Sequence, residues 1–157
     1  MKRVVTLVLA AFLAMTATLI PAGAASAHAG PHVVYLEVSM TIKDADWPDS
    51  DDYAYPRWTR ELRINVDTPS ATTRFEGCAD EVRVVLDVQV SHNPSPFANG
   101  NVAVKTKTRL YEGSSCATTD LEASMSRTFV APEYVGATDS WVISASDDSA
   151  SIRLRVN

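Results

Sequence analysis

Residues 82–90 read Val-Arg-Val-Val-Leu-Asp-Val-Gln-Val, with an apolar side chain at every even position and Arg83, Asp87 and Gln89 between them. Successive side chains of a β-strand point to opposite faces of a sheet, so this alternation predicts a strand with one face in a core and one in solvent. The same period of two recurs in residues 34–43, 61–67, 102–110, 121–129, 141–145 and 152–156. The sequence therefore predicts seven strands.

The segments between these strands are turn-like, and none has helical periodicity. Asn99-Gly100 and Asp147-Asp148 suit tight reversals, because Gly, Asn and Asp tolerate positive φ. Seven half-buried strands in about 130 residues predict a single all-β domain over residues 28–157, an antiparallel β-sandwich of immunoglobulin-like or C2-like architecture. The cysteines do not lie on the strands that an immunoglobulin domain would bridge, so the pattern indicates the architecture and not that family.

Residues 1–27 have the pattern of a secretory signal peptide. Lys2 and Arg3 precede an apolar run over residues 4–20, and Ala25-Ser26-Ala27 matches a small-residue cleavage site. Cleavage there would make His28 the first residue, and the loss of Lys2 and Arg3 would lower the formal net charge from −5 to −7. We therefore expect a secreted, extracellular protein with no membrane attachment after cleavage and, because it is acidic, no nucleic-acid partner.

The two cysteines, Cys78 and Cys116, are expected to form a disulfide, because an exported chain with an even number of cysteines usually pairs them. If each of seven antiparallel strands crosses the sandwich once, alternate connections share an end. Residues 68–81 and 112–120 then lie at the same end, which brings both cysteines within reach of a bridge.

The same alternation assigns residues 44–57, 92–101 and 131–139 to the other end. These loops carry five aromatic residues, Trp47, Tyr53, Tyr55, Phe97 and Tyr134. Exposed aromatic rings stack on sugars and anchor protein interfaces, so the leading hypothesis is a binding module that contacts an extracellular protein or carbohydrate through this loop end and not through a sheet face. The competing interpretation is that the rings form a small core within the long loop.

Residues 44–52 contain five aspartates. Clustered carboxylate oxygens are the ligands that Ca²⁺ requires, and Asp44, Asp46 and Asp51 are the candidate ligands because alternate positions of an extended segment face the same way. No other cofactor is indicated. The simpler interpretation is a solvated acidic loop whose Asp and Ser side chains cap turns.

His28 suggests an alternative function, because its α-amine and imidazole would together chelate Cu²⁺ after signal cleavage. In this one residue the chain resembles secreted copper proteins with an amino-terminal histidine, including small β-sandwich copper carriers and copper polysaccharide monooxygenases. The resemblance implies a copper-binding protein. His32 is close enough in sequence to assist, whereas the seven-strand arrangement puts His92 at the far end.

A third hypothesis is an inhibitor that presents a loop to an extracellular protease. The sequence contains no G-x-S-x-G elbow, P-loop, H-E-x-x-H motif or Cys-His arrangement of a nucleophilic enzyme. We therefore do not expect an enzyme.

Overall fold

The computed structural model describes residues 32–45, 50–65, 67–92, 100–132 and 134–157, so the predicted signal peptide and His28 lie outside the described residues. In these residues the chain forms antiparallel strands and no helix. The strands are β1 (His32–Asp44), β2 (Asp52–Ala54), β3 (Arg57–Ile64), β4 (Ser70–Ala79), β5 (Val82–His92), β6 (Val102–Tyr111), β7 (Leu121–Ala131), β8 (Ala137–Ala145) and β9 (Asp148–Val156).

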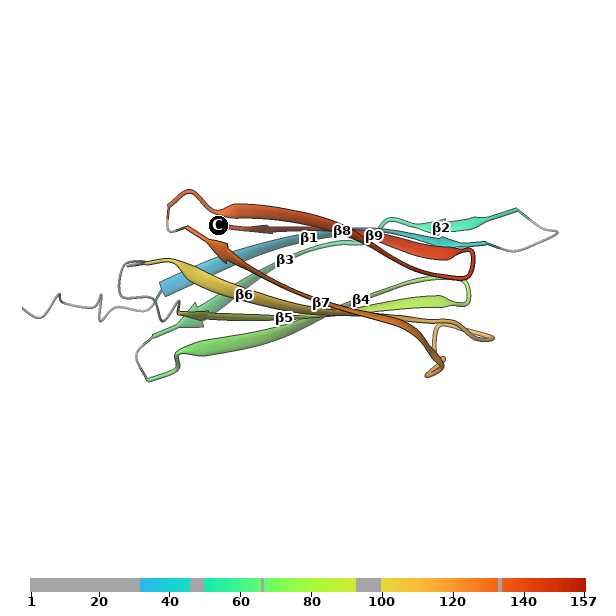
Figure 1. Ribbon diagram of the computed structural model, residues 1–157, viewed down its shortest axis with the longest axis horizontal. Coiled ribbons are helices and arrows are strands. Elements are labelled where there is room, and N and C mark those ends of the chain that lie inside the picture. Colours follow the sequence, from blue (N-terminus) through green and yellow to red (C-terminus); the bar gives the residue numbers. More distant parts are fainter. Residues whose placement is uncertain (1–31, 46–49, 66, 93–99, 133) are drawn as a thin grey trace, which may run out of the picture.

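The strands form two stacked sheets, which appear as two layers in Figure 1. In the five-stranded sheet, β1 pairs with β2 and β3 on one side and with β9 on the other, and β8 completes the sheet beyond β9. The four-stranded sheet has the order β4-β5-β6-β7. An all-β, sandwich-like architecture was predicted and is confirmed at this level.

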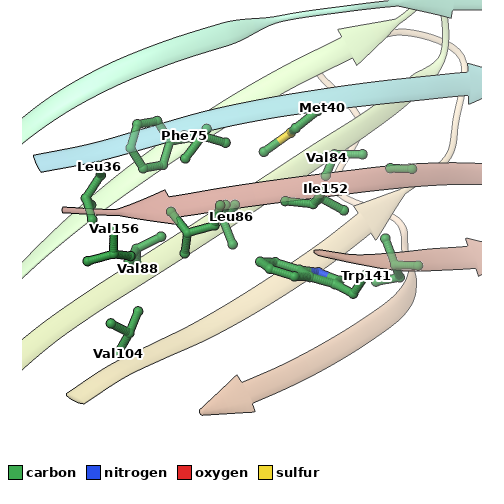
Figure 2. Close-up of a cluster of buried hydrophobic side chains, with 14 of the residues drawn as sticks. Leu36, Met40, Phe75, Val84, Leu86, Val88, Val104, Trp141, Ile152 and Val156 are labelled. Atoms are coloured by element: carbon green, nitrogen blue, oxygen red, sulfur yellow. The ribbon is translucent and has the colours of Figure 1, made fainter. Parts of the chain in front are cut away.

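The core lies between the two sheets and consists of the inward side of each alternating pattern. Leu36 and Ile152 from one sheet face Leu86 and Val104 from the other, and all are completely buried (Figure 2). The sheets are also joined by a buried hydrogen bond, in which Trp141 Nε1 donates to Thr108 Oγ1 over 3.0 Å. This hydrogen bond satisfies the one polar group of the indole in the core.

The predicted number of seven strands is wrong, because the described residues form nine. Strand β4 was missed since Phe75 is the only large apolar residue among its inward positions, the others being alanine, threonine and Gly77. The small residue at Gly77 is required by packing. A Cβ there would lie 2.7 Å from Pro56 and 2.9 Å from Ile42, so the close approach of the two sheets excludes a side chain.

The second additional strand, β2, is the first part of one edge strand that β3 continues. Both pair with β1 in a single register, with Ala54 opposite Ile42 and Arg57 opposite Ser39. Pro56 interrupts the ladder because proline has no N–H, although its carbonyl still accepts a hydrogen bond from the Met40 N–H over 3.0 Å. Residues 52–54 and Arg57, which were predicted to lie in the loop over residues 44–57, are therefore part of an edge strand.

Strand β4 crosses the molecule once more than the seven predicted strands allow. Each connection after β4 therefore lies at the end opposite to the one predicted for it. One end, which we call the acidic end, holds the β1–β2 connection and the β4–β5, β6–β7 and β8–β9 connections. The β7–β8 connection lies at the opposite end with the carboxyl terminus, since Ala137 pairs with Val156 (Figure 1). The prediction that residues 44–57 share an end with residues 92–101 and 131–139 is therefore wrong.

The predicted Cys78–Cys116 disulfide is confirmed, with Cα atoms 5.8 Å apart. It links the end of β4 to the β6–β7 connection at the acidic end, and it indicates an oxidising compartment. In the described part of the chain, no helix has the length and apolar character to cross a membrane.

Reduction of this disulfide should destabilise the protein strongly. Replacing both cysteines, as Cys78→Ser with Cys116→Ser, should lower the free energy of unfolding by on the order of 4 kcal/mol, because the denatured chain regains the freedom of a long loop. Urea unfolding of the oxidised protein and the double variant measures this loss. Alkylation of both cysteines in the native protein without a reductant would contradict the bridge.

Candidate binding surface

Tyr53 and Tyr55 lie side by side on the outer face of the edge strand. Their ring centroids are 6.3 Å apart with planes inclined by 8°, and the residues are 49% and 65% exposed. The Tyr53 hydroxyl donates a hydrogen bond to Asp51 Oδ2 over 3.3 Å, and Asp51 also pairs with Lys43 Nζ at 3.0 Å. The two rings are therefore positioned by a strand and its ion pair, and they are not buried in a core of their own.

Of the other predicted aromatic residues the structure describes Tyr134, which is not brought to this place. Tyr134 is 91% exposed and lies in the β7–β8 connection at the opposite end, with a φ of 64°. Trp47 and Phe97 fall outside the described residues. Of the five predicted binding residues, the described structure thus brings together Tyr53 and Tyr55 and separates Tyr134 from them.

The same outer face carries a cluster of arginines that sequence reasoning did not identify. Arg57 follows Tyr55 by two residues and so shares its face. Across the sheet, Arg57 and Arg153 both pair with Ser39, one on each side, and Arg155 pairs with Glu37. Because serine is small, a hollow of about 480 Å³ lies over this row, lined on the outer face by Glu37, Ser39, Arg57, Thr59, Arg153 and Arg155.

Most arginines that the structure describes are neutralised by a partner. On the outer face of the four-stranded sheet Arg74 and Arg109 both pair with Asp87, and Arg83 pairs with Glu76. In the hollow, by contrast, neither Arg57 nor Arg153 makes an ion pair or side-chain hydrogen bond with any residue in the described ranges, and Arg155 has only a 3.7 Å contact with Glu37 and a hydrogen bond to Asn157. Three guanidinium groups with one carboxylate make the hollow positive in an acidic protein.

A second hollow of about 350 Å³ continues along β1, and it shares Glu37 and Thr59 with the first. It is lined by Tyr35, which is 52% exposed and lies opposite Glu61. We call the whole feature the Tyr–Arg strip, and it consists of Tyr53, Tyr55, Arg57, Ser39, Thr59, Arg153, Arg155 and Tyr35. Its residues alternate with buried ones along three paired strands, and that pairing could not be deduced from the sequence.

The two predicted calcium ligands that the structure describes, Asp44 and Asp51, are engaged in other contacts. Asp44 is buried, and its Oδ2 accepts a hydrogen bond from the Glu81 N–H over 2.8 Å. Asp51 pairs with Lys43, and Asp46 lies outside the described residues. In the ranges that the structure describes, no three His, Cys, Asp or Glu residues are arranged to hold a metal ion. The calcium site stays a prediction.

The histidines are arranged differently from the prediction. His92 was expected at the far end from the amino terminus, but its ring lies 6.1 Å from that of His32, in an edge-on arrangement. The expectation is wrong because β4 reverses the direction of β5, so that the end of β5 meets the beginning of β1.

A carboxyl pair lies at the acidic end, with Asp148 buried and Glu112 half-buried. Asp148 Oδ1 accepts a hydrogen bond from the Ala45 N–H over 2.9 Å, and the Asp148 and Glu112 side chains hydrogen-bond to each other. Burial raises the pKa of the Asp148 carboxyl, helped by the charge of Asp44 and opposed by the Ala45 N–H. Burial and the neighbouring charge of Asp148 likewise raise the pKa of Glu112. A proton shared between the two carboxyls therefore favours the folded state.

This pair should make the protein more stable in mild acid than at neutral pH. A carboxyl whose pKa is higher in the folded state adds stability as the pH falls through that pKa, and the gain is complete below its unfolded value of about 4. Asp148→Asn keeps an oxygen to accept from Ala45 and removes the charge, so it should maintain or raise the melting temperature at pH 7 and weaken its rise on acidification.

The exposed Asp120→Asn, in the same connection as Glu112, is the matched control and should leave the pH dependence unchanged. Melting curves from pH 7 to pH 4.5 test the expectation. A fall in melting temperature for Asp148→Asn that is as large at pH 7 as at pH 5 would show that the carboxylate charge itself is needed.

Comparison of the chain with protein families, with curated proteins and with solved structures finds no match. Inferences about its function therefore rest on the chemistry of the surface described above. The Tyr–Arg strip is the feature on which exposed aromatic rings, an open hollow and unpaired charges coincide.

Proposed function

We propose that this protein is a secreted, non-catalytic binding module that contacts an extracellular protein or carbohydrate through the Tyr–Arg strip. In this proposal the two sheets, of immunoglobulin-like or C2-like kind, act as a rigid scaffold for the strip. The main support for the proposal is that the exposed, stacked Tyr53 and Tyr55 lie on the same outer face as Arg57, next to the hollow that Arg57 and Arg153 line.

The chemistry of the strip suits binding. Tyrosine offers a large apolar ring with a hydroxyl at its tip, and arginine and tyrosine dominate the energetics of many interfaces. The Tyr53 hydroxyl is bound to Asp51 and the two rings stack on each other, which limits the side-chain freedom that binding would remove. The proposed binding surface is a sheet face and not the loop end predicted from the sequence, and it includes two of the predicted residues, Tyr53 and Tyr55.

A second candidate is copper binding near the amino terminus. The observation that favours it is the contact between His32 and His92, since His28 precedes His32 by four residues. Imidazole nitrogens and a free α-amine are donors that suit Cu²⁺. Titration of the secreted protein with Cu²⁺, followed by electron paramagnetic resonance, tests this function: His32→Ala with His92→Ala should alter the spectrum, and an unchanged spectrum would exclude both side chains as ligands.

The principal proposal predicts that Tyr53→Ala with Tyr55→Ala weakens partner binding by about tenfold or more, because interface tyrosines are frequent hot spots. The melting temperature should change by less than about 3 °C, since substitution of exposed side chains rarely alters stability. Retention on an array of oligosaccharides and extracellular proteins measures binding, and thermal unfolding measures stability.

Tyr134→Ala is the control, because Tyr134 is the more exposed tyrosine and lies at the opposite end. It should leave binding unchanged. If the Tyr53 and Tyr55 variant unfolds at a much lower temperature, the rings serve packing. If Tyr134→Ala alone abolishes retention, the binding surface lies at the other end.

A further inference from the structure

The positions of the arginines in the Tyr–Arg strip define a site for an anion. Arg57 and Arg153 lie on opposite sides of Ser39, two strand spacings or about 10 Å apart at their Cα atoms. A guanidinium at the end of a long side chain can reach over the intervening serine from each side. Arg155 lies two residues beyond Arg153 on the same face. Three arginines therefore line the hollow around Ser39, which has a small side chain with a hydroxyl group.

The hollow already accommodates one carboxylate at its edge. Glu37 Oε2 lies 3.7 Å from Arg155 Nη1, and both side chains are about half exposed, so this contact is weak and easily exchanged. Within the described residues Arg57, Arg60 and Arg153 are the arginines that no carboxylate pairs. Two of these three line the same hollow, and Arg60 lines its continuation.

We propose that the Tyr–Arg strip binds a polysaccharide that carries carboxylate groups, with Arg57 and Arg153 holding one carboxylate over Ser39. The inference rests on the proposed binding function and names its ligand class. A planar carboxylate matches the fork of a guanidinium in a bidentate pair, which gives both strength and geometric selectivity.

The shape of the strip favours an extended polymer. Along the β1 direction it runs from Tyr53, opposite Lys43, to Tyr35, a length of eight residues or roughly 27 Å. The arginines occupy its middle and exposed tyrosines occupy both ends. An aromatic ring packs on the apolar face of a sugar, and hydroxyl groups such as those of Ser39 and Thr59 exchange hydrogen bonds with it.

An acidic peptide fits the strip less well. Val38 and Trp58 also line the first hollow, but their side chains pack into the core, so the side chains that point into it are those of Glu37, Ser39, Arg57, Thr59, Arg153 and Arg155. A peptide would therefore find no pocket for an apolar anchor, which is where protein interfaces gain most of their affinity. A chain of acidic sugars needs no such pocket, because its hydroxyl and carboxylate groups are the contacts.

The test is isothermal titration of the purified, disulfide-bonded protein with polygalacturonate, dextran sulfate, neutral dextran and poly-glutamate. Polygalacturonate should bind most tightly, and binding should weaken in 0.5 M NaCl, at about which concentration charge interactions between exposed groups are strongly screened. Arg57→Gln with Arg153→Gln should weaken binding of polygalacturonate by about tenfold or more, as expected for the loss of charge-assisted hydrogen bonds.

The matched control is Lys105→Gln with Lys107→Gln, which removes the same charge from exposed positions on the outer face of the four-stranded sheet. It should change the affinity by less than about twofold, as expected where no specific contact is lost. Equal weakening by both double variants would overturn the site, because it would show attraction by overall charge. Tighter binding of dextran sulfate would overturn the carboxylate assignment, and tighter binding of poly-glutamate would overturn the polysaccharide.

The Tyr53→Ala with Tyr55→Ala variant separates this inference from the proposed function. In one outcome the tyrosine variant loses retention of an array ligand, the arginine variant keeps that retention, and the native protein does not bind polygalacturonate. The binding function then stands, and the anion site is overturned. If neither variant differs from the native protein toward any ligand, both are overturned. Loss of polygalacturonate binding in both variants supports both.

Discussion

Strand β1 pairs with β3 on one side and with β9 on the other, and its completely buried Leu36 and Ile42 prevent either pairing from slipping by one residue. A slip of one residue would turn every buried side chain of the strand outward. The same constraint determines which residues meet on the outer face. Ser39 lies between Arg57 and Arg153 because the core residues on either side of it are fixed, and the hollow exists because that middle position carries a small side chain.

Alternation in the sequence was sufficient to predict strands wherever large apolar residues mark the inward face, as in β1, β5 and β9. It failed in β4, where Gly77 and two alanines face inward so that the sheets can approach, because small residues carry little periodic signal. One missed strand inverted the assignment of later loops to ends, and Tyr134 and His92 were misplaced as a result. The disulfide was still predicted correctly, because Cys78 lies near the end of β4, where the chain has already returned to the end that holds Cys116.

The candidate site was predicted in part. Tyr53 and Tyr55 were identified as exposed aromatic residues, but they were assigned to a loop because Pro56 interrupts the edge strand. Arg153 and Arg155 lay in a predicted strand, whereas Arg57 lay in the predicted loop over residues 44–57. Their convergence depends on which strands pair and in what register, and it becomes visible only when β3 and β9 are placed on either side of β1.

The charges of the molecule are segregated. Every described lysine and arginine lies in a strand, whereas one end gathers Asp44, Asp51, Asp52, Asp80, Glu81, Glu112, Asp120, Asp147 and Asp148. Tyr53, at one end of the Tyr–Arg strip, lies beside Asp51 and Asp52 of the acidic end, so the arginines in the middle of the strip are the part that attracts a carboxylate-bearing polymer. Burial of Asp44 and Asp148 at the acidic end serves folding, since both accept backbone hydrogen bonds there.

In the proposed function, ligand binds to the outer face of the five-stranded sheet. Amide chemical-shift mapping of the isotopically labelled protein, titrated with an oligogalacturonate, tests this most directly, because each perturbed amide reports its own position. We expect the perturbed amides to include Ser39, Thr59 and Arg153, and those of Lys105 and Lys107 to remain unchanged. Perturbations confined to the four-stranded sheet or to the β7–β8 connection would contradict the claim.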